Sequence, residues 1–295
     1  VVTYTRQFFR PINQLSNLLT LFQSAIAGAE RVFEILDEEN ENVNEHGKEK
    51  ARFDGEVTFE NIQFEYVKGK PILRGIHFTA RAGEMVAIVG PTGSGKTTII
   101  QLLTRFYDTT GGRILLDGEP ITNYKMTNVR DHVGVVLQDT YLFSGTVREN
   151  IRFGKLDATD EEVEQAAKVA YAHNFIKYLP QQYETMLTSG GMNLSQGQRQ
   201  LIAIARAILE DPDILILDEA TSSVDTMTEV HIQKGLNNLM KGRTSFVIAH
   251  RLKTIENADT ILVLKDGQIL ESGNHDLLMK KGGFYATLQN NLATE

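Results

Sequence analysis

The stretch from Met85 to Thr98 constrains the fold of this chain more than any other. It begins with an apolar run that indicates a buried strand, turns through several glycines, and ends where a helix begins. The turn has the spacing Gly-x-x-x-x-Gly-Lys-Thr from Gly90 onwards. Glycines let backbone N–H groups point to one place, and a helix N-terminus adds positive charge there. The sequence therefore predicts a strand, a phosphate-binding loop and a helix.

The side chains of the loop indicate that its ligand is a nucleotide. Lys96 can reach the β- and γ-phosphates, and the hydroxyl of Thr97 is a suitable ligand for Mg²⁺. A glycine-rich turn without function is the alternative, but it leaves the Lys-Thr pair at the helix start unexplained. The expected nucleotide-binding residues of the loop are Gly90, Pro91, Thr92, Gly93, Ser94, Gly95, Lys96, Thr97 and Thr98.

Composition and charge narrow the class of protein. The chain has 295 residues, of which 41% are hydrophobic, as in a globular protein with a large core. Its net charge of −8 argues against a nucleic-acid partner, because proteins that bind the phosphate backbone are usually basic. The sequence contains no cysteine, which excludes disulfides and cysteine-ligated metals, and no apolar run long enough to span a membrane. It starts at Val1 without Met, so we expect it to be part of a longer chain.

Two segments precede the predicted strands. Residues 6–36 carry apolar side chains three and four positions apart, which predicts an amphipathic helix. The pattern leaves open whether its apolar face packs on a surface outside this chain or is free. Residues 37–52 are charged and nearly without apolar side chains, which predicts a linker.

After the linker, the pattern predicts strands interrupted by a helical insertion. Residues 57–66 and 72–78 alternate in polarity, as antiparallel strands with one exposed face do. Asp117 and Asp266, each followed by Gly, separate pairs of apolar runs and predict two hairpins. Helical spacing at 161–178 predicts that helices separate the strand-forming segments.

Four apolar runs without alternation each end at a polar residue or at the glycine loop. Such runs are typical of strands covered on both faces, and ligands bind at the carboxyl ends of strands in open α/β sheets. We therefore expect the four ends to meet at one crevice. The runs are 86–89, 133–137, 214–217 and 246–249, and the residues that follow them are Gly90, Gln138, Asp218 and His250.

The residues at these strand ends suit phosphoryl transfer. Asp218 can hold Mg²⁺, and Glu219 beside it can orient and deprotonate the attacking water. Gln138 is a neutral ligand for Mg²⁺ or water, and His250 can hold that water in place through the γ-phosphate or Glu219. Taken singly, each has a plain alternative: an acidic turn, a solvated glutamine and a structural histidine. The functional interpretation depends on their occurring together with Lys96.

The segment 194–198 precedes a helix with one apolar face and has two interpretations. Ser195 and Gln198 have the spacing of a capping box, which explains them by helix initiation alone. A helix start rich in Ser and Gly is also an anion site.

In order and spacing, these motifs resemble those of an ABC transporter ATPase domain. The signature of that family is Leu-Ser-Gly-Gly-Gln, and this chain has Gln196 in place of the first Gly. The resemblance covers residues 53 to about 290. It implies an α/β fold, a P-loop NTPase core with a mostly parallel sheet flanked by helices, together with an antiparallel β subdomain and a helical subdomain at about 139–195. The motifs that carry it are 90–97, 194–198, 214–219, 223–225 and 249–251.

The resemblance also implies how the site works. Two such domains would close head to tail around two ATP molecules, with Mg²⁺ as cofactor. Each ATP would lie between the phosphate loop of one domain and the signature of the other. Gln138 would form the Q-loop, His250 the switch histidine, and Tyr66 would stack on adenine unless it only packs on the sheet. The residues that reach the partner's ATP would be Ser195, Gln196, Gly197, Gln198 and Asp225.

The N-terminal part resembles the end of the last membrane helix of an exporter. On that resemblance, residues 1–36 are a helical remnant of the membrane domain or its cytoplasmic extension, 37–52 the linker and 53–295 the ATPase domain. The expected function is ATP hydrolysis that drives export, at the cytoplasmic face of the cell membrane. The expected partners are the membrane domain of the same chain and a second ATPase domain, identical or different. Residues 188–193 lack the acid that exporters usually carry before the signature, which leaves the detail of coupling open.

Two other functions are considered on the sequence alone. A soluble ABC ATPase of DNA repair would need a long coiled-coil insertion, for which the interval from Lys96 to Ser195 is too short, and a translation factor would carry two ATPase domains in tandem. A regulatory domain would bind ATP without hydrolysing it, whereas this chain has both Glu219 and His250. With a different partner whose motifs are impaired, one of the two sites would still be inactive.

Overall fold

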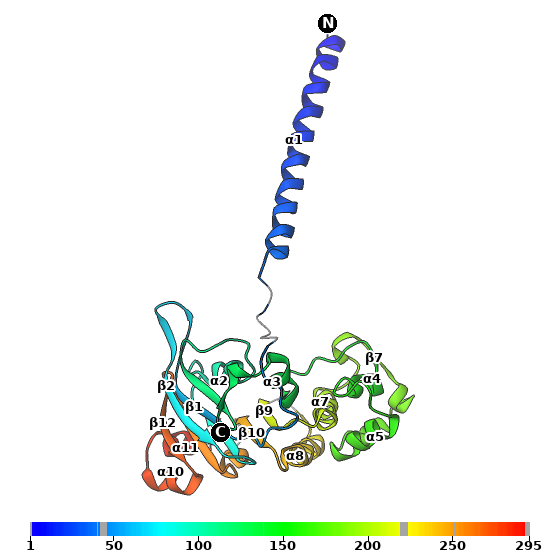
Figure 1. The fold of residues 1–295 in the computed structure, drawn as a ribbon. Helices are drawn as coiled ribbons and strands as arrows, with labels where there is room; N and C mark the ends of the chain where they lie inside the picture. Colours follow the sequence, from blue (N-terminus) through cyan, green and yellow to red (C-terminus); the bar gives the residue numbers. More distant parts are fainter. Residues whose placement is uncertain are drawn as a thin grey trace. The chain divides into compact units, whose positions relative to one another are not determined.

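The computed structural model describes residues 2–39, 41, 46–137, 139–218, 224–249 and 252–292. The chain divides into two units, Val1–Val43 and Asn44–Glu295. The first unit is the helix α1, Val2–Leu36, which confirms the helix expected at 6–36 (Figure 1). Its large apolar side chains, among them Phe22 and Phe33, are exposed. No helix in the described part of the chain combines the length and the hydropathy needed to cross a membrane.

The second unit contains a mostly parallel sheet and an antiparallel sheet. The six-stranded sheet has the order β12-β11-β3-β10-β9-β6, in which only the edge strand β12 is antiparallel to its neighbour. Its strands are β3 (Met85–Val89), β6 (Val133–Val136), β9 (Ile214–Asp218), β10 (Thr244–Ile248), β11 (Thr260–Lys265) and β12 (Gln268–Gly273). The antiparallel sheet has the order β2-β1-β4-β5, with β1 (Val57–Val67), β2 (Lys70–Ala80), β4 (Gly111–Leu116) and β5 (Glu119–Pro120).

The apolar runs of the parallel strands arise because both faces of their sheet are covered. In β9, Leu215 and Leu217 belong to one hydrophobic core, and Ile214 and Ile216 belong to the other. The first core includes side chains from the helices that follow the insertion, and the second lies between the parallel and antiparallel sheets. All four predicted buried strands are thus confirmed, in the adjacent order β3-β10-β9-β6. The antiparallel strands and the hairpins at Asp117 and Asp266 are confirmed as well.

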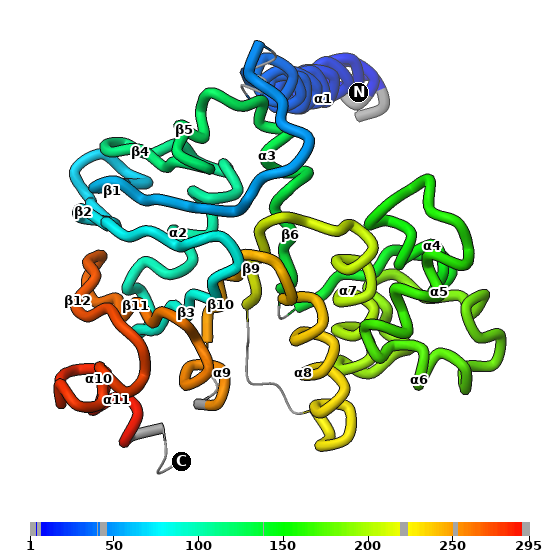
Figure 2. Tube along the Cα trace, turned by 60° about the horizontal axis from the view of Figure 1, so that its bottom comes forward, coloured from blue at the N-terminus to red at the C-terminus, as the bar shows by residue number. Residues whose placement is uncertain are grey.

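Helices cover the two faces of the parallel sheet. Figure 2 shows α7 between the strand β6 and the group formed by α4, α5 and α6. On the other face, α2 and α3 contribute to the core shared with the antiparallel sheet. The helices of this unit are α2 (Lys96–Leu103), α3 (Met126–His132), α4 (Val147–Arg152), α5 (Asp160–Val169), α6 (His173–Ile176), α7 (Gln196–Glu210), α8 (Thr226–Met240), α9 (Leu252–Glu256), α10 (His275–Lys281) and α11 (Phe284–Leu292). Three short 3₁₀ helices are η1 (Ile121–Asn123), η2 (Gln182–Glu184) and η3 (Ser189–Gly191), and a two-stranded sheet pairs β7 (Gly145–Thr146) with β8 (Met186–Leu187).

The helical spacing at 161–178 corresponds to two helices rather than one. The helix α5 ends at Val169, and Tyr171 has a φ of 63°, in the left-handed region, before α6 begins. The ring of Tyr171 stacks on His231 of α8, with the ring centroids 5.7 Å apart. Apolar spacing does not reveal this break, because a single left-handed residue changes the direction of the chain without changing which side chains are apolar.

Residues 48–56, here called the N-terminal strap, are bonded along the second unit before β1 begins. The backbone of Lys50 exchanges two hydrogen bonds with the side chain of Asn128, each 3.0 Å long. Arg52 pairs with Asp213 at 3.1 Å. The carboxylate of Asp117 accepts bonds from the backbone N–H groups of Asp54, Gly55 and Glu56. Residues 48–52, the last part of the predicted linker, therefore lie against the folded unit.

Candidate active site

The carboxyl ends of four parallel strands meet at one edge of the sheet. Ile88 of β3 is opposite Ile248 of β10, which is opposite Asp218 of β9. On the other side of β9, Val136 of β6 is opposite Leu217. The phosphate loop after β3 and the acid at the end of β9 are therefore at the same edge, as the sequence predicts. The three predicted residues that follow β6, β9 and β10 lie outside the described residues: Gln138, Glu219 and His250.

Two glycines of the phosphate loop are required by close packing. Gly90 has a φ of +156°, and a Cβ there would lie 2.3 Å from the carbonyl oxygen of Leu264 in β11. Gly95 has a φ of +107°, and a Cβ there would lie 2.6 Å from a methyl group of Leu73 in β2. Any larger residue would displace the loop or its neighbours. The two sheets thus fix the path of the loop from both sides.

The helix α2 begins at the loop without a side-chain cap. Its N-cap is Gly95, which has no side chain to accept a bond from the first turn. The N–H groups of Lys96, Thr97 and Thr98 have no partner inside the helix, because the first N–H groups of an α-helix lie ahead of its bonding pattern. Together with the helix dipole, they form the anion site that the sequence predicts.

Lys96 is bonded within the loop, and its pKa is influenced by the acid at the end of β9. Its ammonium donates to the carbonyl oxygens of Gly90 at 2.6 Å and Pro91 at 3.0 Å. Burial lowers the pKa of Lys96, and the negative charge of Asp218 opposes that shift. The charge of Asp218 therefore acts on Lys96, although the two residues are 122 positions apart in the sequence (218 − 96).

The residues present fit a magnesium ion shared with a nucleotide. Mg²⁺ takes oxygen ligands and is usually held by one or two protein groups together with substrate phosphates. Thr97 at the start of α2 supplies a hydroxyl, and Asp218 supplies a carboxylate. Within the described ranges, no group of three or more His, Asp or Glu side chains forms a metal site by itself. Phosphate oxygens of a bound nucleotide would add to these two ligands.

Tyr66 lies at the end of β1 and contacts the same helix that begins at the phosphate loop. Its side chain is exposed, with 44% of the surface of the residue accessible, so it is not a buried sheet-packing tyrosine. Its hydroxyl lies 3.0 Å from the hydroxyl of Thr98 and is hydrogen-bonded to Gln101. The sequence interpretation did not include Gln101. The available signal was its position three residues after Thr98, which places both on one face of the helix.

The start of α7 is a capping box, as the sequence predicts. The N–H of Gln198 donates to the hydroxyl of Ser195 at 3.2 Å, and the N–H of Ser195 donates to the side chain of Gln198 at 3.1 Å. Ser195 is exposed and Gln196 is half-buried. Gly197 is buried, and a Cβ there would lie 2.5 Å from Thr228 of α8, so packing alone requires this glycine.

Asp225 is the N-cap of α8. Its carboxylate accepts a hydrogen bond of 3.0 Å from the N–H of Thr228. Hydrogen bonds to Thr228, the backbone bond first, lower the pKa of Asp225. The structure therefore gives Asp225 a capping role within its own chain, and the predicted contact with a partner's nucleotide stays a prediction.

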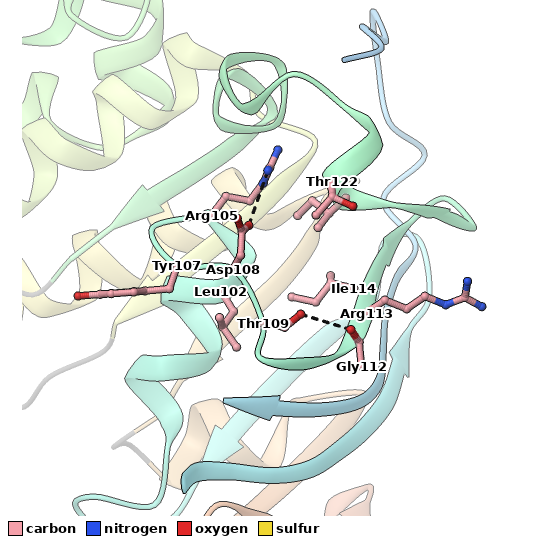
Figure 3. Close-up of a pocket in the computed structure, with 10 residues that line it drawn as sticks. Leu102, Arg105, Tyr107, Asp108, Thr109, Gly112, Arg113, Ile114 and Thr122 are labelled. Carbon is pink, nitrogen blue, oxygen red and sulfur yellow. Dashed lines mark hydrogen bonds and ion pairs between the residues drawn. The ribbon is translucent and has the colours of Figure 1, made fainter. Parts of the chain in front are cut away.

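A separate small recess lies near the end of α2 (Figure 3). Its volume is about 90 Å³, and its walls come from the segment that follows α2 and from β4. Arg105, 5% exposed, bonds the carbonyl of Tyr124 at 3.1 Å and lies 3.6 Å from Asp108. Tyr107, in the same segment, points away from these groups in Figure 3. This recess is too small for a nucleotide and contains none of the predicted site residues.

Known proteins match the chain over nearly all of its length. Residues 73–222 match the family described as ABC transporter. An uncharacterised ABC transporter ATP-binding protein of Bacillus subtilis, YfiC, is 54% identical over 97% of this chain and 47% of its own length. A fatty acid ABC transporter ATP-binding/permease protein of Mycobacterium bovis is 48% identical over 96% of this chain and 45% of its own length. The chain thus spans about half the length of the curated relatives it matches.

A solved structure matches the fold. It is a bacterial Atm1-family ABC exporter with ATP bound, which superposes with a TM-score of 0.80 and is 39% identical. The superposition covers 99% of this chain and 51% of the exporter chain. Three observations indicate the same family: the strand order, the phosphate loop with its helix, and the family match over more than half of the residues. The chain belongs to the ABC transporter family, and it carries the ATP-hydrolysing domain of that family on a P-loop NTPase fold.

Proposed function

We propose that the chain binds Mg²⁺ and ATP at the phosphate loop, closes on a second ATPase domain, and hydrolyses ATP to power export across a membrane. The observation that carries the proposal is that the phosphate loop and Asp218 lie at the same edge of the sheet. The negative charge of Asp218 also acts to raise the pKa of Lys96. Lys96 is already held inside the loop by two carbonyls, where it would neutralise the β- and γ-phosphates.

The proposed chemistry is an in-line attack of water on the γ-phosphate, in which the water oxygen bonds to the γ-phosphorus while the bond from that phosphorus to the β,γ-bridging oxygen breaks and ADP leaves. Glu219 accepts the proton of the water as general base, and His250 holds the water and the phosphate in place. Gln138 also helps to orient the attacking water and the γ-phosphate. Mg²⁺, when bound, would be held by Thr97 and Asp218 and would neutralise developing charge on the phosphate oxygens. The order of the strands supports these roles, since Gln138, Glu219 and His250 come within two residues of the ends of β6, β9 and β10, and these three strands are neighbours in the sheet.

The second half of each site is proposed to come from a partner domain. Ser195 is exposed at the start of α7, where the helix dipole favours an anion. Its hydroxyl oxygen accepts from Gln198, which leaves its proton available to a phosphate oxygen. Gln196, Gly197 and Asp225 lie in the same region of the chain fold, because α7 packs closely on the start of α8. On this proposal, a single domain binds ATP but hydrolyses it slowly.

A groove beside β6 is the proposed contact for the membrane domain. It has a volume of about 300 Å³ and lies between the segment after β6 and α7. Exposed aromatic side chains of Tyr141 and Phe143 line it. The hydroxyl of Tyr141 bonds Ser189 at 2.8 Å, which joins this groove to the segment just before the signature. We therefore assign the chain to the cytoplasmic face of a membrane, with α1 as a part of the membrane domain or its extension.

The first prediction concerns the general base. Glu219→Gln should keep the affinity for ATP within about threefold and reduce turnover by roughly 100-fold or more, because loss of general-base catalysis has effects of that size. ATP binding is measured by equilibrium dialysis and turnover by phosphate release. The variant should also form an ATP-dependent dimer in size-exclusion chromatography.

Glu161→Gln is the matched control, since it makes the same chemical change on the exposed surface of α5. It should leave both quantities unchanged. Unchanged hydrolysis in Glu219→Gln would remove Glu219 from the mechanism.

A further inference from the structure

The hydroxyl of Tyr66 connects the antiparallel sheet to the helix of the phosphate loop. It lies 3.0 Å from the hydroxyl of Thr98 and donates to the side-chain oxygen of Gln101. Thr98 and Gln101 are three residues apart on α2, so they present their side chains on one face of that helix. One helix therefore holds both the phosphate site, at its N-terminus, and the end of the Tyr66 ring.

Two other aromatic side chains restrict the ring of Tyr66. Phe64 meets it at a centroid distance of 4.8 Å with an interplanar angle of 90°, and Tyr107 meets it at 5.1 Å and 84°. These edge-to-face contacts are favourable geometries for aromatic pairs. With its hydroxyl end bonded to α2 and its ring packed against two others, Tyr66 has little freedom to rotate, and yet 44% of it is exposed.

Tyr107 is itself held in place by the segment that follows α2. Arg105 donates to the carbonyl of Tyr124 at 3.1 Å, and its own carbonyl accepts a bond of 2.9 Å from Arg130. Tyr107 and Arg105 both line the recess of Figure 3. Of the groups that hold Tyr66, Thr98, Gln101 and Tyr107 thus come from α2 and its continuation, whereas Phe64 belongs to the same strand as Tyr66.

We propose that Gln101 is a positioning residue of the nucleotide site, which holds the Tyr66 ring as a stacking platform for adenine without touching the nucleotide. The inference rests on the proposed stacking role of Tyr66. A platform held at a fixed place relative to the phosphate loop loses less conformational entropy when ATP binds. Without Gln101 the ring gains freedom, and ATP binding has to restrict it. The base therefore binds more weakly, while the phosphates bind as before.

The test is the substitution Gln101→Leu, which removes the acceptor but keeps a side chain of similar size. The Kd for ATP should rise roughly three- to tenfold, which corresponds to about 0.7–1.4 kcal/mol. The KM for ATP should rise by the same factor with kcat unchanged. The Kd for inorganic triphosphate, which has no base, should stay the same. Gln101→Glu keeps an acceptor oxygen and should restore most of the affinity for ATP.

The matched control is Gln165→Leu, on the exposed surface of α5, which should change none of these quantities. Thermal unfolding of each variant shows whether the fold is retained. An equal loss of affinity for ATP and for triphosphate in Gln101→Leu would overturn the inference, because the effect would then be on the loop. Tighter ATP binding would overturn it too, since the contact would then be blocking the site.

Variants of Tyr66 separate this inference from the proposed stacking. Tyr66→Phe removes the hydroxyl, so Gln101→Leu should have no further effect in that background. Tyr66→Ala should raise the Kd for ATP more than Gln101→Leu does. If Tyr66→Ala leaves the Kd unchanged, the stacking role fails. If Tyr66→Ala weakens ATP binding but Gln101→Leu does not, the positioning role of Gln101 alone fails.

Discussion

Ser195 combines a structural role and a proposed functional role in a single side chain. Its oxygen accepts the N–H of Gln198 and so caps α7, whose first turn would otherwise have an unbonded donor. The same exposed hydroxyl is proposed to reach a partner's γ-phosphate. Loss of activity on truncation would therefore be ambiguous, and two substitutions are needed to separate the roles.

The prediction for Ser195 compares two replacements at this position: Ala, which cannot cap a helix, and Asp, which can. Ser195→Ala should lower the free energy of unfolding by about 1 kcal/mol, because the cap is lost, and should lower ATP hydrolysis as well. Ser195→Asp keeps an N-cap and should leave unfolding nearly unchanged, but its carboxylate repels the γ-phosphate and should abolish hydrolysis. Urea unfolding and phosphate release check the two effects. Wild-type hydrolysis in Ser195→Asp would show that this helix start does not face a nucleotide.

Sequence identified the residues whose roles depend on local pattern. The capping box at Ser195 and the phosphate loop with Lys96 were predictable, because each is set by neighbours within a few positions. Gln101 was not, since its partner Tyr66 is 35 positions away and belongs to a different sheet. The bonds of Lys96 to two loop carbonyls are also invisible in a motif, because they depend on the path of the backbone.

At the scale of elements, α7 ends in Glu210, a partly buried carboxyl group beside the groove of Tyr141. Burial, followed by the negative charge of Asp131 in α3, raises the pKa of Glu210 to about 7, and Arg206 one turn earlier opposes the shift. Arg206 is itself occupied by a bond of 2.9 Å to the carbonyl of Asn150. The end of α7 therefore carries a carboxyl group that is partly protonated near neutral pH.

This shift predicts a pH-dependent contribution to stability. The folded pKa of Glu210, about 7, lies above its ordinary value of 4.5, so its contribution is fully present below pH 4.5 and is lost as the pH rises through 7. Glu210→Gln stays neutral. The difference in free energy of unfolding, variant minus native, should therefore increase by about 2 kcal/mol when the pH is raised from 5 to 8. Urea unfolding at four pH values checks it, with Glu161→Gln as the control, and parallel pH profiles would contradict it.

Elements were predictable where period and caps agree and less so at breaks. The runs that became β3, β9 and β10 have no alternation because both faces are covered, and this is a property that the sequence displays directly; in the edge strand β6, Val135 is exposed although the run is equally apolar. The helix α5 starts at a capping box of Thr159 and Glu162 that can be recognised in the sequence. Its end at the left-handed Tyr171 cannot, since no glycine or proline marks the turn.

At the scale of the whole molecule, the phosphate loop and the signature (residues 194–198) lie at different places in the domain. The loop follows β3 near the sheet edge, whereas Ser195 opens α7 beside the helical insertion. In the proposed dimer each domain supplies one half of two sites. On this proposal the loop determines what is bound, and hydrolysis needs a second molecule because the exposed start of α7 acts on the partner's nucleotide.

Dilution tests this arrangement directly. Specific ATPase activity of the chain should fall as its concentration is lowered, because the active species is a dimer, while ATP binding per molecule should not change. Phosphate release is measured over a hundredfold range of protein concentration at saturating ATP and Mg²⁺. Turnover per molecule that stays constant over that range would contradict a site shared between two domains.

The N-terminal strap has a mechanical consequence. Its bonds to Asn128, Asp117 and Asp213 are spread along the chain rather than gathered at one point. A pull on the chain from the N-terminal side is therefore shared among several anchors before it reaches β1, and it loads them in shear. The strap is consequently fixed to the second unit at several positions of its backbone, so the loss of one bond would leave the others to hold it in place.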